Sequence, residues 1–270
     1  MRRTLLFLPG NNPGNLQSGA VFGADGIILD LEDSVSPAEK DAARLLVASA
    51  LMSVDYAGVE RAVRINTLAT GGEADIAAVV PCCPDAVMLP KTESIDDIRA
   101  CEALLEKAEA ACGATKKTLI MPLIETPMGL ARCLEIALAS KRVTLLSLGG
   151  EDYTASLGTQ RTREGSELIF ARGMLANAAA AAGIDSIDAP FADKGKFAIN
   201  PRQISVIHKA FAPTAKEIAW AKRILVVIEE AQKKGAGVIA LDGKMVDAPI
   251  VARARRTIYM ADMLGLLEEE

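Results

Sequence analysis

The sequence predicts a (β/α)8 TIM barrel of eight parallel strands, each followed by a helix, with a C-terminal helical extension. Short continuous apolar runs bounded by turn residues recur along the chain and are typical of strands buried on both faces. From one strand end to the next the chain advances by about 25–35 residues, the spacing expected for a barrel of about 250 residues. We expect the catalytic barrel over residues 1–212 and the extension over 213–270, with a doubly wound open sheet as the weaker alternative.

The expected strands follow in chain order at residues 4–9, 26–33, 61–66, 86–91, 118–125, 143–152, 185–191 and 196–201. Helices between them have recognisable ends. Residues 36–39 and 214–217 fit the capping-box pattern, with proline at the first helical position of the former. Ser94 is expected to open a helix that Gly113 ends, and Gly235 to stop the helix that begins after Thr214.

The connection between the seventh and eighth runs is too short for this pattern. Only residues 192–195 separate them, whereas a parallel crossover needs at least about 10–12 residues. Either the two runs form an antiparallel hairpin, or a helix-bearing segment is absent from the chain as written, through an omitted loop or a true deletion. We expect the absent segment.

Composition excludes several classes of protein. A net charge of −5, 4% aromatic residues and scattered lysines and arginines argue against a nucleic-acid surface. No apolar run reaches the roughly 18 residues of a membrane span, and the short N-terminal run lacks a cleavage site, so a first strand is expected rather than a signal peptide. Five cysteines without a C-x-x-C pair indicate the reduced thiols of a cytoplasmic protein.

Acidic side chains close three of the apolar runs. They are Asp30, Glu32 and Asp33 in the second run, Glu125 in the fifth, and Glu151 and Asp152 in the sixth. Because ligand sites of parallel α/β proteins lie off the carboxyl ends of their strands, we expect these acids to converge on one mouth. An isolated carboxylate at a strand end is otherwise a helix cap or a surface residue.

The residue types favour a hard cation at this mouth. The single histidine, His208, is expected on a helix in a surface or packing role, since a lone imidazole makes no metal cluster and no serine or cysteine lies in a nucleophile motif. Mg²⁺ takes one or two carboxylates, keeps waters and completes its shell with substrate oxygens. Glu125 and Asp152 fit that description.

Arg64 ends the third run, where its planar guanidinium could hold a substrate carboxylate bidentately. An ion pair with Asp33 or Glu32 is the alternative, and the two roles can coexist. Residues 10–12 (Gly-Asn-Asn), after the first run, offer backbone donors for an anionic or amide-rich ligand, although such residues are ordinary in a turn.

A set of motifs now carries a resemblance over nearly the whole chain. They are LLFLPGNN, ILDLEDSV, the K-x-x-A-R of residues 40–44, VRIN, VMLPK, IETPMG, LGGEDY, INPRQI, FAPT and LDGKMVDAP. In order and spacing these motifs resemble the β-subunits of citrate lyase and their relatives in the aldolase/citrate lyase family. Asn200 before Pro201 is more similar to the citrate lyase β-subunits than to the free-standing lyases, many of which have histidine there. Family members carry a longer, helix-bearing segment at the short connection.

The resemblance implies a role for each matching residue. It makes Glu125 and Asp152 the Mg²⁺ ligands and makes Arg64 and Glu125 the substrate contacts, with Glu32 and Asp33 placed behind them. It implies a Mg²⁺-dependent carbon–carbon lyase acting on a 3-hydroxy-3-carboxyacyl thioester, such as citryl on an acyl carrier protein, or citramalyl or malyl on coenzyme A.

In that reaction Arg64 would stabilise the thioester enolate, and Asp33, Asp247 or a water on the metal would take the hydroxyl proton. The resemblance also implies that Asp247 joins the active site of a neighbouring subunit, which would make the enzyme a homo-oligomer, with a trimer favoured. A helix cap is the alternative for Asp247, since Ala-Pro follows it.

Two rival functions remain. One is a non-catalytic homologue that binds a carrier protein, against which the presence of Arg64, Glu125 and Asp152 argues. The other is a phosphate-binding barrel isomerase, which would need a glycine-rich grip after the last two strands, where only Gly195 is found.

Overall fold

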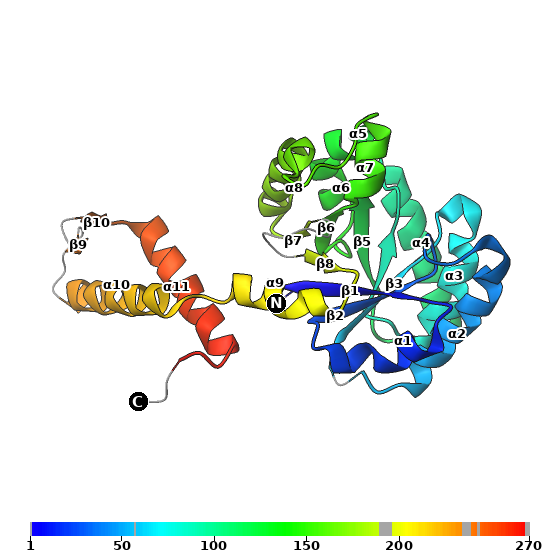
Figure 1. The fold of residues 1–270 in the computed structure, drawn as a ribbon, viewed down its shortest axis with the longest axis horizontal. Helices are drawn as coiled ribbons and strands as arrows, with labels where there is room; N and C mark the ends of the chain where they lie inside the picture. Colours follow the sequence, from blue (N-terminus) through cyan, green and yellow to red (C-terminus); the bar gives the residue numbers. More distant parts are fainter. Residues whose placement is uncertain (1, 57, 189–195, 234–238, 242–243, 268–270) are drawn as a thin grey trace. The chain divides into compact units, whose positions relative to one another are not determined.

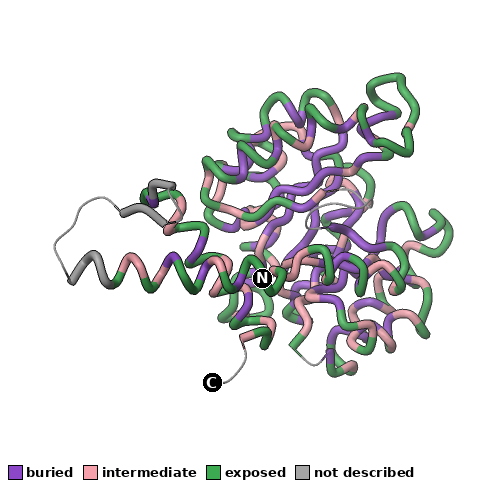
Figure 2. Tube along the Cα trace, turned by 60° about the vertical axis from the view of Figure 1, so that its left-hand side comes forward, coloured by how far each residue is buried: buried purple, intermediate pink, exposed green. Residues whose placement is uncertain are grey.

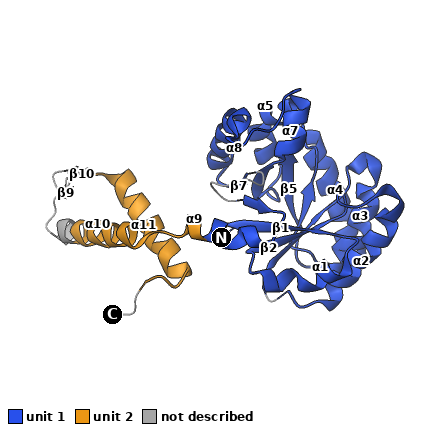
Figure 3. Cartoon of the chain, viewed as in Figure 1, with its two compact units in different colours: residues 1–208 blue, residues 209–270 orange. Residues whose placement is uncertain are grey.

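The computed structural model describes residues 2–56, 58–188, 196–233, 239–241 and 244–267. The chain divides into two compact units, residues 1–208 and 209–270 (Figure 3). The division lies inside α9 (Arg202–Phe211), near the boundary expected between residues 212 and 213.

Eight parallel strands form the first unit (Figure 1). They are β1 (Thr4–Pro9), β2 (Gly26–Asp30), β3 (Glu60–Arg64), β4 (Ala86–Leu89), β5 (Leu119–Ile124), β6 (Leu145–Leu148), β7 (Asp185–Ile187) and β8 (Lys196–Ala198). Their order in the sheet is β7-β6-β5-β4-β3-β2-β1-β8. Asp188 and Lys196 make a parallel bridge between the two outer strands, so the barrel is nearly closed and the predicted fold class is confirmed.

The contact between β7 and β8 decides one of the two alternatives for their connection. Phe197 donates its backbone N–H to the Asp188 carbonyl at 3.2 Å, in a parallel pairing, so the antiparallel hairpin is wrong. β7 also ends at Ile187, earlier than expected, because pairing with β6 stops there. Residues 192–195, and with them the question of an absent segment, lie outside the described residues.

The barrel core explains why the strands read as continuous apolar runs. One interior cluster takes side chains from the strands of the barrel, and most strand residues are buried, whereas β7 has two exposed residues of three (Figure 2). The interior cluster consists of Leu5, Ile28, Ala62, Ala86, Met88, Met121, Leu123, Leu145, Ile187 and Phe197.

Helices alternate with the strands. They are α1 (Pro13–Ser18), α2 (Lys40–Ser53), α3 (Gly72–Val79), α4 (Ile95–Cys112), α5 (Pro127–Ala131), α6 (Cys133–Leu138), α7 (Gly150–Ser156) and α8 (Ile169–Ala182). α4 begins at the expected Ser94, whose side chain and that of Asp97 complete a capping box, and Gly113 ends it with φ 67°. The capping box expected at residues 36–39 is wrong. There the Ser36 hydroxyl donates to the Glu39 carboxylate instead of capping a helix.

The second unit is a helical hairpin with a small β-ribbon. It contains α10 (Ala215–Lys233), β9 (Ile239–Leu241), β10 (Lys244–Val246) and α11 (Ala248–Met263). The expected capping box at its start is confirmed, since Thr214 N–H donates to Glu217 and Glu217 N–H donates to the Thr214 hydroxyl. Gly235, expected to stop α10, lies outside the described residues. Among the described helices of both units, none is long and apolar enough to cross a membrane.

Candidate active site

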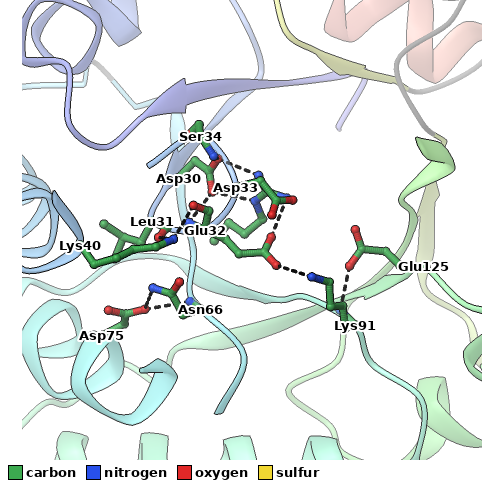
Figure 4. A network of polar contacts seen from close by, with 11 residues as sticks. Asp30, Leu31, Glu32, Asp33, Ser34, Lys40, Asn66, Asp75, Lys91 and Glu125 are labelled. Atoms are coloured by element: carbon green, nitrogen blue, oxygen red, sulfur yellow. Dashed lines mark hydrogen bonds and ion pairs between the residues drawn. The ribbon is translucent and has the colours of Figure 1, made fainter. Parts of the chain in front are cut away.

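Four of the acids predicted to converge, Asp30, Glu32, Asp33 and Glu125, lie at or just after the carboxyl ends of β2 and β5 (Figure 4). Asp30 ends β2, Arg64 ends β3 and Glu125 directly follows β5. Asp152 differs from the expectation, because the chain turns into α7 immediately after Gly149 and places Asp152 in the first helical turn rather than on a strand. An acid is favourable there, since the N-terminus of a helix carries a partial positive charge.

Arg64 is held by three carboxylates. Its Nε and Nη2 donate to the two oxygens of Asp30, each at 2.7 Å, and its Nη1 lies 2.8 Å from Glu32 and 3.3 Å from Asp33. Burial acts to lower the pKa of Arg64, but Asp30 and the two other acids raise it above its ordinary value, so the guanidinium stays charged. The predicted ion pair with Glu32 and Asp33 is therefore present. The edge formed by Nε and Nη2, however, is already used by Asp30.

Glu32 lies between two cations. Its Oε2 is 2.8 Å from Arg64 Nη1, and its Oε1 is 3.4 Å from Lys91 Nζ. Burial raises the pKa of Glu32, and the neighbouring Asp33 adds to this, while Arg64 and Lys91 act to lower it. Glu32 is thus a buried acid whose charge depends on these two partners.

Lys91 also lies at this mouth, although the sequence motif VMLPK that contains it does not indicate a role for it. It follows β4 and adopts φ 51°, a left-handed conformation that is uncommon for a residue other than glycine. In this conformation its backbone N–H donates to Glu125 Oε2 at 2.8 Å. Its position directly after a strand is the signal that could have identified it, but its backbone conformation cannot be read from the motif.

Glu125 is almost fully enclosed. It is 4% exposed, and burial raises its pKa to about 8, with the charges of Glu32 and Asp152 adding to the rise against the lowering effect of the Lys91 N–H. Gly149 leaves room for it, since a Cβ at residue 149 would lie 2.5 Å from Glu125 Cγ. Asp152, the other predicted metal ligand, is thus one of the charges that act on Glu125.

The donor set fits a hard divalent cation. No group of three or more histidine, cysteine, aspartate or glutamate side chains arranged for a metal occurs among the described residues. The predicted ligands Glu125 and Asp152 offer only carboxylate oxygens. Such donors suit an ion that completes its shell with waters and substrate oxygens, as Mg²⁺ does. A cation between Glu125 and Asp152 would also offset the repulsion that raises the pKa of Glu125.

α2 supports the loops after β2 and β3. Lys40 Nζ donates to the backbone carbonyl of Glu32 and to that of the residue before it. One turn further along α2, Arg44 Nε donates to Asp75 at 2.7 Å, and the same wholly buried carboxylate accepts the backbone and side-chain N–H groups of Asn66. The K-x-x-A-R motif thereby fixes the two chain segments that flank Arg64.

Two of the three backbone donors offered by residues 10–12 are used within the turn. Gly10 N–H donates to the Asp30 carbonyl at 2.8 Å and Asn12 N–H to the Pro9 carbonyl at 3.2 Å. The Asn12 side chain caps α1. An anion or amide site at these residues stays a prediction.

Three other residues lie away from the carboxylate cluster or have local partners. His208 contacts Thr4 Oγ1 at 2.9 Å and lies 3.7 Å from Asp25, at the amino ends of the strands, as a packing role requires. Asp247 caps α11 by accepting from Ile250 N–H at 3.1 Å, within the second unit. Glu151 is exposed and lies 3.7 Å from Arg161.

Together these features define a barrel with a group of carboxylates and a buried arginine at its carboxyl mouth. The chain belongs to the HpcH/HpaI aldolase/citrate lyase family, whose model matches residues 3–203. Membership of this family and the full-length matches below identify it as a lyase.

Three similar proteins illustrate the range of these matches. The chain is 42% identical over 291 aligned residues to citrate lyase subunit beta of Leuconostoc mesenteroides subsp. cremoris, covering 100% of this chain and 96% of the relative. It is 32% identical to L-malyl-CoA/beta-methylmalyl-CoA lyase of Cereibacter sphaeroides, covering 97% and 95%. The structure of CitE from Mycobacterium tuberculosis with magnesium, acetoacetate and coenzyme A matches with a TM-score of 0.76 and 28% identity, covering 96% and 97%.

Proposed function

We propose that this protein is a Mg²⁺-dependent carbon–carbon lyase that cleaves a 3-hydroxy-3-carboxyacyl thioester of the citryl-acyl carrier protein type. The products are an acetyl thioester and a 2-oxo acid such as oxaloacetate. The observation that carries the proposal is Arg64 held by three carboxylates at the barrel mouth that also contains the buried Glu125, in a chain 42% identical to a citrate lyase β-subunit over its whole length.

The residues of the mouth suit the steps of this reaction. Glu125 and Asp152 would hold the ion, which when bound supplies polarisation of the substrate hydroxyl and the adjacent carboxylate. Asp33, whose side chain is 57% exposed and lies 3.3 Å from Arg64, would take the hydroxyl proton. The carbon–carbon bond then breaks, its electrons pass to the thioester enolate near the Arg64 charge, and protonation of the enolate carbon completes the acetyl thioester.

A free-standing citramalyl-CoA or malyl-CoA lyase is the second candidate. The 32% identity to a malyl-CoA lyase supports it, since the same residues would cleave a thioester on coenzyme A. Asn200 before Pro201 favours the citrate lyase type.

Asp247 is proposed to enter the active site of a neighbouring subunit, where it would be the alternative base to Asp33. The enzyme would then be a homo-oligomer, with a trimer favoured. Its five unpaired thiols suit the cytoplasm.

The decisive experiment supplies the protein and Mg²⁺ with citryl-, citramalyl- and malyl-thioesters, on coenzyme A and on an acyl carrier protein, and follows 2-oxo acid release. Fastest release of oxaloacetate from the citryl thioester supports the main proposal. Faster release of pyruvate or glyoxylate supports the second candidate. Mg²⁺ binding without release from any thioester would mean a non-catalytic carrier-binding homologue.

A further inference from the structure

Lys91 occupies a position between the cation site and the arginine. Its backbone N–H is bound to Glu125 Oε2 at 2.8 Å, which fixes the start of its side chain beside a metal ligand. The side chain extends from there toward Glu32, with Nζ 3.4 Å from Oε1 (Figure 4). The two dashed contacts of Lys91 in the figure therefore connect the acid of β5 with the acid of the β2 loop.

The mouth has a surplus of negative charge. Five carboxylates gather there, namely Asp30, Glu32, Asp33, Glu125 and Asp152, and the cations in contact with their side chains among the described residues are Arg64 and Lys91. The proposed substrate is itself an anion, because a carboxylate lies next to its hydroxyl. The Mg²⁺ of the proposed function would attract this ligand, and a side-chain cation that can turn toward the ligand would add to the attraction.

The two cations differ in how many of their nitrogen atoms already contact an acid. Arg64 is only 11% exposed, and its Nε, Nη1 and Nη2 all contact Asp30, Glu32 or Asp33. The Lys91 side chain is 46% exposed and makes one ion pair, at 3.4 Å.

If the Lys91 side chain turned from Glu32 toward a ligand, Glu32 would still be paired with Arg64. Glu32 keeps its 2.8 Å contact with Arg64 Nη1. The lysine side chain is flexible, so its ammonium can reorient more readily than the Arg64 guanidinium, which is hydrogen-bonded to both Asp30 oxygens.

We propose that Lys91 is a substrate-binding residue. Its ammonium binds the carboxylate next to the substrate hydroxyl, which becomes the carboxylate next to the keto group of the 2-oxo acid product. This inference rests on the proposed function, because it assigns a contact within the same site. The backbone N–H of Lys91 is bound to Glu125 Oε2 at 2.8 Å, so Lys91 lies next to one of the two residues that would hold the ion.

The test compares Lys91→Met with Lys116→Met. Lys116 is a matched control, because its side chain is 55% exposed and pairs with Asp85 at the amino ends of the strands, away from the mouth. Calorimetry measures Mg²⁺ alone and then oxaloacetate, pyruvate and glyoxylate in the presence of Mg²⁺, and steady-state kinetics separates kcat from KM.

Lys91→Met should weaken oxaloacetate binding and raise KM at least about tenfold, the loss expected for one charge-assisted hydrogen bond. Mg²⁺ affinity without the oxo acid should change less than about threefold, because the Lys91 backbone N–H is retained. Lys91→Arg should recover part of the binding, and Lys116→Met should behave as the wild type.

Wild-type oxaloacetate affinity in folded Lys91→Met, with turnover intact, would overturn the inference. If that variant does not fold, Lys91→Gln gives the same comparison. Failure of the proposed function looks different, since the wild type itself would then release no 2-oxo acid from any thioester.

Discussion

Gly149 lies directly against the carboxylate of Glu125. A Cβ at residue 149 would be 2.5 Å from Glu125 Cγ and 2.6 Å from Oε1, closer than a carbon can approach without displacing its neighbour. Glu125 can therefore hold its position only because residue 149, just before α7, has no side chain.

Gly149→Ala should displace Glu125 and weaken Mg²⁺ binding at least about tenfold, the size of effect seen when the support of a metal ligand is removed. The control is Gly173→Ala in α8, where an added Cβ meets nothing within 4 Å. That substitution should leave Mg²⁺ affinity unchanged and stabilise the helix by up to about 1 kcal/mol. Equal Mg²⁺ affinities of the two variants by calorimetry would contradict the assigned contact.

Asp152→Ala should reduce Mg²⁺ affinity by at least about tenfold, because it removes one of two carboxylate ligands. The free energy of unfolding should fall by no more than about 1 kcal/mol, the worth of an acid in a first helical turn. Glu151→Ala is the control, since Glu151 belongs to the same turn of α7 but is exposed. Unchanged Mg²⁺ affinity in Asp152→Ala would remove Asp152 from the metal site.

Arg64→Lys should lower kcat/KM at least about 100-fold, because one ammonium cannot replace a guanidinium that contacts three acids. It should also lower the free energy of unfolding by about 1–3 kcal/mol, since Asp30, 1% exposed, loses part of its pairing. Arg61→Lys, whose partner is Asp85, is the control for the substitution itself. Near wild-type turnover with reduced stability would show that Arg64 is only structural.

The fold was predictable because it depends on patterns local in the chain. Strands buried on both faces need continuous apolar runs, and the first strand coincides with its expected range. The ends of the other strands were extended too far, because the apolar run continues into loops, as at Leu31 after β2. Strand existence is set by composition, whereas strand ends are set by pairing with the neighbouring strand.

The site was predictable only in part. Arg64, Glu125 and Asp152 lie at or after the carboxyl ends of parallel strands, which the sequence pattern predicts. The bidentate pairing of Arg64 with Asp30 was missed, because it depends on the register that aligns Asp30 with Arg64 across β2 and β3. Lys91 was missed because its hydrogen bond to Glu125 requires a left-handed backbone conformation, which no local pattern indicates.

His208 should make the stability of the protein depend on pH. Burial lowers the pKa of His208 and the charge of Arg3 lowers it further, against the opposing effect of Asp25. Below about pH 6.5 the unfolded chain therefore takes up a proton that the folded chain resists, so the free energy of unfolding falls as the pH falls. His208→Gln should show a smaller fall between about pH 7.5 and 5.5 in urea titrations. An identical pH dependence in the variant would assign the effect to other groups.

Asp247 provides a test of whether the active site is shared between subunits. Asp247→Asn keeps a good capping residue for α11, whose Ile250 N–H needs an acceptor, so the helix should remain stable. If Asp247 rather than Asp33 is the base, Asp247→Asn and Asp152→Ala should each be inactive alone. Suppose that Asp247 acts in a neighbouring subunit and that equal amounts of the two variants co-assemble. A barrel of the Asp247→Asn variant then keeps its own Asp152 and can receive an intact Asp247 from a neighbouring Asp152→Ala subunit. Random assembly makes such intact sites about one quarter of all sites, so about a quarter of wild-type activity should return.

The control for this experiment is the same mixture without co-assembly, in which each variant keeps its own oligomer and activity stays at the level of the separate variants. Native mass spectrometry establishes that the mixed oligomers have formed. If they have formed and no activity returns, Asp247 either belongs to the site of its own subunit or acts only as the cap of α11. A variant Asp247→Asn with full activity would decide for the cap, because asparagine satisfies Ile250 but cannot accept a proton as a carboxylate does.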